Sequence, residues 1–463
     1  MTSISQPDEP PSGLTYSQAL EYLFGCINYE QRAPLPEDLR LDEMHRLLEA
    51  LGNPHQDLRI VHVAGSKGKG SVSATLAAIL QKAGYRAGLF TSPHLTRPEE
   101  RVQIDGVPIP AAELTSIVID IRDAVTKARL QPTFFEAITA LGFLHFQRRQ
   151  VDVAVVEVGL GGRLDSTNVC LPEVALVTSI SFDHMSQLGN SLDRIAREKA
   201  GIFKKNRPAV SGVIDPAVSA VIAEIARERG APLRQLNRDM SYRYESARLS
   251  SDSLATEQRA RVQITTWKRQ WPWLLLRLMG EHQAANAAVV LATIEILCER
   301  GWRISEEAVA EGLRTVEWPS RVELIGRSPW LVLDCAHNTA SARALVSTLA
   351  EVFPPTRRVL VFASSNDKEV PAILRILAPY FAYACFTPYG NNPRAVPPDQ
   401  LAHWWKENGG ADCSCHSLAS DALAEARKLA QPADLICITG SVFLAGELRP
   451  LLKKEDSGLL SHG

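Results

Sequence analysis

The sequence lacks the features that would place the protein in a membrane or outside the cell. No apolar run approaches the roughly 20 residues that a membrane-spanning helix needs, and an apolar stretch such as residues 271–276 is far shorter. Residues 1–12 are polar and contain proline, so they lack the apolar centre of a secretory signal. The eight cysteines are scattered along the chain, which is typical of free thiols in a reducing compartment. We therefore expect a cytoplasmic protein with no membrane partner.

A strong excess of charge is also missing. The formal net charge is −2, so nothing favours nucleic acid or an anionic surface as the main partner. The hydrophobic content of 45% is that of an ordinary globular protein. Because a chain of 463 residues is too long for one hydrophobic core, we expect two or three domains.

The sequence does contain a glycine- and lysine-rich loop, residues 65–71, which we call the phosphate loop. An apolar run at residues 59–63 predicts a buried strand before it, and the alanine-rich residues 72–82 predict a helix after it. A strand, a glycine loop and a helix start in this order form a cradle for phosphate, because backbone N–H groups and the helix N-terminus point inward. Within this cradle Lys69 would bind the outer phosphates and the Ser71 hydroxyl a magnesium ion.

The spacing of the phosphate loop departs twice from the common pattern G-x-x-x-x-G-K-[ST]. The leading glycine comes two residues late, at Gly65, and Gly70 separates Lys69 from Ser71. A glycine-rich turn with no ligand is the alternative interpretation. The strand before the loop and the helix after it favour phosphate binding.

Two further strands are expected to end at the same edge of the sheet as this loop. Residues 151–156 predict a buried strand that ends at Glu157, and residues 174–180 predict another that leads to His184. In open parallel sheets ligands bind outside the carboxyl ends of the strands. Glu157 is therefore a candidate magnesium partner. A lone histidine is more often structural, but its position makes His184 a candidate for binding metal or phosphate.

The alternation of predicted strands and helices indicates an α/β protein. We predict a P-loop ATPase-like parallel-sheet domain at residues 1–317 and a smaller Rossmann-like α/β domain at residues 318–463. Residues 238–278 alternate polar and apolar side chains, which predicts a small antiparallel element within the first domain. Residues 96–110 are interpreted as a surface loop followed by a small hairpin.

Taken together in this order, the motifs resemble those of the Mur-ligase-type ATP-dependent ligases, most closely the folylpolyglutamate synthase and dihydrofolate synthase branch. The resemblance runs from about residue 14 to residue 449. The motifs that carry it are Gly65-Ser66-Lys67-Gly68-Lys69-Gly70-Ser71, Thr91-Ser92-Pro93-His94-Leu95, residues 157–165, Asp183-His184, residues 198–202, Gly280-Glu281-His282-Gln283 with Asn286, residues 318–321, Asp334-Cys335-Ala336-His337-Asn338 and Thr439-Gly440-Ser441. The displaced glycine of the phosphate loop is itself a habit of this family.

The resemblance implies roles for individual residues. Those implied to contact the nucleotide are Gly65, Ser66, Lys67, Gly68, Lys69, Gly70, Ser71, Asn286, Arg321 and Asp334. Those implied to hold two magnesium ions are Ser71 and Glu157 for the first, and His184 with a carbamylated Lys199 for the second. Those implied to bind the substrates are Ser92, His94 and Arg101 for the folate, and His337 and Ser441 for the incoming glutamate. Lys69, Lys199 and His337 are the candidate catalytic residues.

Two positions depart from the family pattern. Ser66-Lys67 stands where many bacterial members have Thr-Asn, and Cys335 replaces the usual glycine or alanine. A small thiol fits a packed position, so we interpret Cys335 as a packing residue.

The implied reaction joins L-glutamate to dihydropteroate, to a tetrahydrofolate or to both, with small molecules as the only partners and with a monomer expected. The carboxylate would attack the γ-phosphate of ATP to give an acyl phosphate and ADP, and the glutamate amine would then displace phosphate. Because two anions must approach each other, Lys69 and two magnesium ions would offset the repulsion. A second domain carrying Arg321, Asp334 and His337 would act as a lid that excludes water.

Several alternatives stay open. A nucleotide-dependent switch would need only the phosphate loop, and would leave the second domain without a role. A peptidoglycan-type ligase shares the architecture, although residues 91–95 and the expected lack of a nucleotide-sugar domain argue against it. A zinc site at residues 413–416 has the wrong spacing and no second ligand pair. A monofunctional folylpolyglutamate synthase is the alternative within the family.

Overall fold

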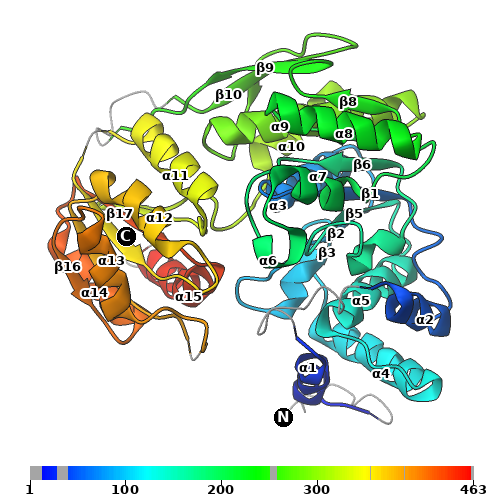
Figure 1. Ribbon diagram of the computed structural model, residues 1–463, viewed down its shortest axis with the longest axis horizontal. Coiled ribbons are helices and arrows are strands. Elements are labelled where there is room, and N and C mark those ends of the chain that lie inside the picture. Colours follow the sequence, from blue (N-terminus) through cyan, green and yellow to red (C-terminus); the bar gives the residue numbers. More distant parts are fainter. Residues whose placement is uncertain (1–12, 29–39, 251–257, 355, 391, 460–463) are drawn as a thin grey trace, which may run out of the picture.

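Two open sheets, each covered by helices, organise the chain in the computed structural model (Figure 1). The structure describes residues 13–28, 40–250, 258–354, 356–390 and 392–459. The first domain, as we define it, consists of the larger sheet, a small three-stranded sheet and helices α1 to α10. The second domain consists of the remaining six-stranded sheet and helices α11 to α15. The predicted α/β class, with a parallel-sheet first domain and a smaller Rossmann-like second domain, is confirmed.

The sheet of the first domain has eight strands. In their order across the sheet they are β4 (Val107–Pro108), β3 (Val102–Ile104), β2 (Ala87–Phe90), β5 (Val153–Glu157), β1 (Ile60–Ala64), β6 (Val174–Val177), β7 (Ala209–Ser211) and β8 (Leu233–Gln235). Strands β2, β5, β1, β6, β7 and β8 are parallel to one another. Strands β3 and β4 add an antiparallel hairpin at the edge next to β2. Every residue of β1 and β5 is buried, as expected for central parallel strands covered on both faces.

Helices cover both faces of this sheet (Figure 1). They are α1 (Tyr16–Gly25), α2 (Asp42–Ala50), α3 (Lys69–Lys82), α4 (Ala111–Ala128), α5 (Phe134–Arg148), α6 (Met185–Leu188), α7 (Leu192–Ala200), α8 (Pro216–Arg229), α9 (Glu281–Glu299) and α10 (Glu306–Thr315). Helices α1, α2, α4 and α5 share one apolar cluster with Ile60 and Val156. Helices α3, α9 and α10 belong to a second cluster, which includes Val61 and Val155. Because alternate strand residues point to opposite faces, the two clusters lie on opposite sides of the sheet.

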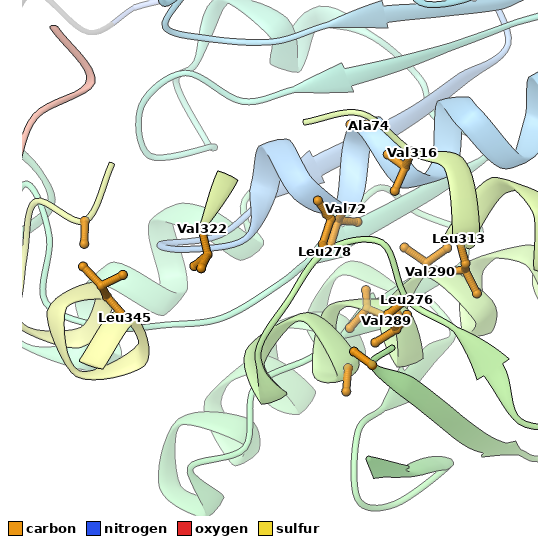
Figure 2. Packing of buried hydrophobic residues seen from close by; sticks show 14 of the residues in the cluster. Val72, Ala74, Leu276, Leu278, Val289, Val290, Leu313, Val316, Val322 and Leu345 are labelled. Carbon is orange, nitrogen blue, oxygen red and sulfur yellow. The ribbon is translucent and has the colours of Figure 1, made fainter. Parts of the chain in front are cut away.

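A three-stranded antiparallel sheet packs on the side of α9, as the sequence predicts. Its strands are β9 (Met240–Glu245), β10 (Arg261–Thr266) and β11 (Leu274–Leu275). Figure 2 shows Leu276 and Leu278, which follow β11, close to Val289 and Val290 of α9 and Val72 of α3. The same cluster continues through Val322 to Leu345 of the second domain (Figure 2). The two domains are therefore joined by a continuous apolar contact.

The sheet of the second domain has six strands. In order they are β12 (Glu323–Arg327), β13 (Trp330–Leu333), β17 (Leu435–Thr439), β14 (Arg358–Phe362), β15 (Tyr383–Phe386) and β16 (Cys413–Cys415). All neighbours are parallel except β12 and β13. The helices are α11 (Thr339–Val352), α12 (Val370–Leu377), α13 (Pro398–Glu407), α14 (Ala419–Leu429) and α15 (Val442–Leu459).

The segment that follows β2 differs from the prediction of a surface loop. After residues 91–97, which we call the acceptor loop, a short 3₁₀ helix spans Pro98–Arg101 and leads into the β3–β4 hairpin. Glu99 and Arg101 are buried, and the Arg101 guanidinium lies 5.1 Å from the centre of the Phe134 ring. The Tyr16 hydroxyl donates to the Glu99 carboxylate (2.5 Å) and Arg101 lies over Phe134, so distant residues bury both charges, which a low apolar content in sequence does not reveal.

The predicted boundary between residues 317 and 318 falls in the connection between α10 and β12. The division at that residue stays a prediction. Within the described residues, the helices are all too short or too polar to cross a membrane.

The central strand β1 carries a buried histidine that links the sheet to the edge of the site. His62 is fully buried, and its Nε2 lies 2.8 Å from Thr167 Oγ1. The Thr167 hydroxyl in turn donates to the carboxylate of Asp165. Burial lowers the pKa of His62 to about 3, and the positive charge of Lys204 acts in the same direction. The ring is therefore neutral at physiological pH.

This histidine should make the folded state sensitive to acid. Below pH about 6.5 the unfolded chain protonates His62 and the folded chain does not, so stability falls as the pH falls toward 3. Between pH 7 and pH 5 we expect a loss of about 2 kcal/mol from this residue. Urea unfolding of wild type and His62→Asn at pH 7 and pH 5 gives the free energy of unfolding at each pH. The contribution of His62 is the difference between the two proteins in how much this free energy changes from pH 7 to pH 5. Equal changes would contradict the prediction, and His403→Asn controls for replacement of an exposed histidine on α13.

Candidate active site

The carboxyl ends of the strands in both domains open onto one cleft of about 1290 Å³. The first domain contributes the phosphate loop, Glu157 at the end of β5, and residues 178–185 after β6. The second domain contributes residues 334–338 after β13, residues 365–369 after β14, and residues 440–443 after β17. This arrangement is the one expected for a ligand site in open α/β sheets.

The phosphate loop lies between β1 and α3, as predicted. Gly68 caps α3 with a left-handed backbone (φ 82°), and no side chain caps this helix within the described chain. The backbone N–H groups of the first turn of α3 therefore face the cleft without hydrogen-bond acceptors from a capping side chain. A phosphate bound there would accept hydrogen bonds from them. The Lys69 ammonium donates to the carbonyl of Gly65 (3.2 Å), which holds it over the loop.

Two of the glycines are required by close contacts. At Gly65, with φ 148°, a Cβ atom would lie 1.9 Å from Oγ1 of Thr178. At Gly68 a Cβ atom would lie 2.5 Å from Oδ1 of Asn286, a predicted nucleotide contact on α9. The unusual glycine spacing thus lets the loop fit between β6 and α9.

The phosphate loop is attached to the segment that follows β6. Ser66 N donates to Ser179 O (2.8 Å), and Ser66 Oγ donates to Ser181 O (3.0 Å). Lys67 forms an ion pair with Asp183, with 2.7 Å between Nζ and Oδ2. Burial opposes ionisation of Asp183, but the Lys67 ammonium holds the pKa of this carboxyl well below its usual range. Burial lowers the pKa of Lys67 to about 8.

The residues predicted for the first magnesium ion lie in the first turn of α3 and at the end of the central strand β5. Ser71 is buried in the first turn of α3, and Gln283 Nε2 donates to its Oγ (3.4 Å). The Glu157 carboxylate accepts from Ser92 N (3.2 Å), and burial raises its pKa to about 7. The Glu157 carboxylate and the Ser71 hydroxyl line the same cleft and offer only oxygen donors, which fits magnesium.

His184 lines the cleft next to Asp183, and its backbone is left-handed (φ 51°). Its Nε2 lies 3.8 Å from Oδ1 of Asp183. Its side chain is 39% exposed, and desolvation within the cleft together with the positive charges of Lys368 and Lys199 lowers the pKa of His184. The ring is therefore neutral and keeps a lone pair, which is the form that binds a metal ion.

Lys199 lies in α7 and does not line the cleft. It is 3% exposed, and burial lowers its pKa to about 7, with a further contribution from the charge of Lys69. A lysine with this pKa is partly neutral at physiological pH, and the neutral amine is the form that reacts with carbon dioxide. The donor chemistry is therefore compatible with carbamylation.

The second domain brings four predicted residues to the cleft, namely Arg321, Asp334, His337 and Ser441. The Asp334 carboxylate accepts from the backbone N–H groups of Val322 (3.0 Å) and Ala336 (2.7 Å), and burial raises its pKa. His337 Nδ1 lies 2.8 Å from Cys335 O. Since a carbonyl only accepts, this nitrogen carries the proton and Nε2 is an acceptor. Burial lowers the pKa of His337 well below its usual value, so the ring is neutral.

The predicted site residues do not all lie in the cleft. Most of the phosphate loop, Ser92, Glu157, His184, Asn286 and the four residues of the second domain line it. Gly65, His94, Arg101 and Lys199 lie behind its surface. Arg101 Nε donates to His94 Nδ1 (2.8 Å), so the structure pairs these two predicted folate residues with each other.

Sequence reasoning did not identify two charged residues of the cleft. Asp183 lies between cations of both domains, because its Oδ1 is 3.9 Å from the ammonium of Lys368. Lys368 also pairs with Asp367 (3.3 Å). The Asp183-His184 dipeptide at a strand end was a usable signal for Asp183. Lys368 had no signal beyond its place after a strand.

The alternative zinc site is not supported. Cys413 and Cys415 lie in strand β16, and the neighbouring Ser414 Oγ lies 2.8 Å from His416 Nε2. Across the described ranges of the chain, no three His, Cys, Asp or Glu side chains are grouped so that they could hold a metal ion. Cys335 is buried, as its interpretation as a packing residue requires.

Comparison with known protein families agrees with this architecture. The family described as "Mur ligase middle domain" matches residues 63–294, and the one described as "Mur ligase, glutamate ligase domain" matches residues 320–442. The chain belongs to the Mur ligase family. The resemblance stated from the motifs is thereby confirmed.

Individual members of the Mur ligase family are similar over nearly the whole chain. The folylpolyglutamate synthase of Lacticaseibacillus casei is 34% identical, over 88% of this chain and 92% of its own. The dihydrofolate synthase/folylpolyglutamate synthase of Bacillus subtilis is 34% identical, over 95% of this chain and 99% of its own. The structure of Escherichia coli FolC in complex with DHPP and ADP has a TM-score of 0.83 at 28% identity and covers 96% of this chain and 99% of that chain.

The Mycobacterium tuberculosis folylpolyglutamate synthase complexed with ADP has a TM-score of 0.84 at 32% identity, and the match covers 94% of this chain and 98% of that chain. As a Mur ligase of this branch, the chain is an acid–amino-acid ligase. The ADP in the related structures supports the use of ATP.

Replacing Gly68 should weaken nucleotide binding. An alanine there has a strained left-handed backbone and a Cβ atom against Asn286, so we expect ADP affinity to fall about tenfold or more. Gly52→Ala is a matched control, because its φ of 80° imposes the same backbone strain and nothing lies within 4 Å of the added atom. Isothermal titration with ADP measures both variants. An equal loss in the two would refute the role assigned to the Gly68–Asn286 contact.

Proposed function

We propose that the protein adds L-glutamate to dihydropteroate, to a tetrahydrofolate or polyglutamate, or to both, with release of ADP and phosphate. The observation that carries this proposal is a single cleft in which the phosphate loop faces Arg321, Asp334 and His337 of the second domain. A nucleotide switch would not need these second-domain residues. The domain division at residues 317 and 318, a cytoplasmic location and a monomeric state belong to the same proposal.

The first step is phosphoryl transfer to the acceptor carboxylate. The uncapped first turn of α3 and the Lys69 ammonium bind and orient the outer phosphates of ATP. The acceptor carboxylate attacks the γ-phosphate, forms the acyl phosphate, and ADP leaves. Burial raises the pKa values of Glu157 and Asp334, and the positive charge of Arg321 opposes this rise at both carboxyl groups. These cations lower the repulsion between two anions that must meet.

Three residues of the cleft, together with the buried Lys199 outside its lining, supply donors suited to two magnesium ions. Ser71 and Glu157 would hold one, and His184 with a carbamylated Lys199 would hold the second. When bound, magnesium supplies positive charge that stabilises the transferring phosphoryl group. The side chains of the cleft and the uncapped N-terminus of α3 supply the rest of the stabilisation of the phosphoryl group.

The second step is attack of the glutamate amine on the acyl carbon. We propose that Ser441 and His337 hold the glutamate. His337 is neutral with its acceptor nitrogen Nε2 free of the proton, so it is suited to accept a hydrogen bond from the amine and orient it. Closure of the second domain over the cleft would keep water from the acyl phosphate.

The direct test is an assay of coupled product formation. With ATP, magnesium and glutamate, the purified protein should release ADP and form an amide only when a pteroate or folate acceptor is added. ATP or GTP turnover without acceptor and without a new amide would instead support the nucleotide switch. Running 7,8-dihydropteroate and tetrahydrofolate as separate acceptors distinguishes a bifunctional enzyme from a monofunctional folylpolyglutamate synthase.

The role of Lys199 can be tested by chemical rescue. Lys199→Ala removes the carbamate, and we expect kcat to fall about a hundredfold, with partial recovery when formate or acetate supplies the missing anion. Lys204→Ala is a matched control, because Lys204 lies in the same region and donates to Asn168 O (2.9 Å) outside the cleft. Full activity of Lys199→Ala would remove the carbamate role.

A further inference from the structure

The acceptor loop (residues 91–97) of the first domain reaches into the second domain. Its Leu95 packs against a cluster of the second domain that contains Leu444, Ala445 and Leu448 of α15. Thr96 Oγ1 also donates to Gly446 O (3.5 Å). Figure 1 shows α15 facing the first domain on the side where the segment before β3 lies. A side chain of one domain thus completes the core of the other.

Gly446 allows this contact. A Cβ atom at Gly446 would lie 1.9 Å from the carbonyl oxygen of Leu95, so any larger residue must separate the helix from the loop. The backbone of Gly446 is not left-handed, and the residue lies inside α15. Glycine is disfavoured inside helices relative to alanine. The close approach of the acceptor loop therefore explains why a glycine stands at position 446. The backbone conformation does not require one there.

The acceptor loop is held in a defined conformation. The Glu100 carboxylate accepts hydrogen bonds from three successive backbone N–H groups, those of Leu95 (2.8 Å), Thr96 (3.1 Å) and Arg97 (3.0 Å). At the other end of the loop, Ser92 N donates to Glu157. Because both ends are fixed, the carbonyl and side chain of Leu95 have a fixed direction toward α15.

A separate contact joins the domains at another place. Leu249 N, after β9, donates to Val352 O at the end of α11 (2.9 Å). Gly280, just before α9, lies close to Thr348 of α11, since a Cβ atom there would be 2.4 Å from its Oγ1. Figure 1 shows α11 near the small sheet, apart from α15. Leu95 therefore provides one of several contacts between the domains, which also include the apolar cluster through Val322 and the Asp183–Lys368 ion pair.

We infer that Leu95 and Gly446 position α15, and with it Ser441, against the cleft, and so control the affinity for the incoming amino acid. Ser441 immediately precedes α15, its Oγ accepts from Phe443 N (3.1 Å), and its carbonyl accepts from Ala445 N (3.2 Å). A shift of α15 therefore moves Ser441. This inference rests on the proposed function, and Leu95 and Gly446 act as positioning residues that do not touch the reacting atoms.

Gly446→Ala separates a positioning role from a structural one. The higher helix propensity of alanine offsets part of the cost of separating α15 from the loop. KM is therefore measured at a temperature at which thermal unfolding shows both variant and wild type to be folded. The added methyl group should displace α15 from the acceptor loop and raise KM for glutamate about tenfold, with KM for ATP unchanged. Leu95→Ala should act in the same direction, and Leu95→Met, of similar volume, should restore the wild-type KM. Leu451→Ala, at an exposed position of α15, is the control.

Amide hydrogen exchange gives a readout that needs no activity. In Gly446→Ala, residues 92–97 and 441–446 should exchange faster than in wild type, while residues 348–352 of α11 should be unchanged. If wild type forms the amide and Gly446→Ala keeps the wild-type KM for glutamate, the inference is overturned and the proposed function stands. If wild type forms no amide with any acceptor, the proposed function falls and the role in glutamate affinity falls with it.

Discussion

The rest of the site depends on an excess of positive charge at the first turn of α3. Lys67 and Lys69 belong to the phosphate loop, and Lys368 approaches from the second domain. Asp183 is the carboxylate paired with Lys67 and Lys368 within the described cleft. Burial, and to a smaller extent repulsion from neighbouring lysines, lowers the pKa values of Lys67 and Lys199. A bound polyanion would neutralise these positive charges, and the triphosphate of a nucleotide is such a polyanion.

Two sheets that face each other bring the residues of the site together. Parallel strands place loop residues of the same sheet together at one edge, so the phosphate loop, Glu157 and His184 become neighbours although about 120 residues separate the first from the last. The second sheet presents Asp334, His337 and Ser441 from its own strand ends. Because the substrates meet between two rigid edges, a small movement of one domain changes access to the cleft.

Much of the first domain could be predicted from local patterns. The buried run of β1, the glycine loop and α3 follow from residue type and periodicity, and so does the small antiparallel sheet at residues 240–275. The position of Arg101 could not be predicted in the same way. Its charge indicated a surface loop, whereas the structure places it against Phe134 and beside His94. That outcome depends on α5, which lies some thirty residues further along the chain.

The sequence by itself determined the α/β class, the phosphate loop and the family, because these depend on short-range patterns and on motif order. The tertiary structure decided which distant residues meet. It pairs Lys67 with Asp183 and Asp183 with Lys368, and it packs Leu95 against the apolar cluster that includes α15. These contacts join residues more than one hundred positions apart, and local propensity carries no information about them. The Lys67–Asp183 pair arises when the strands of the first sheet assemble, and the other two contacts arise only when apolar packing has placed the two domains side by side.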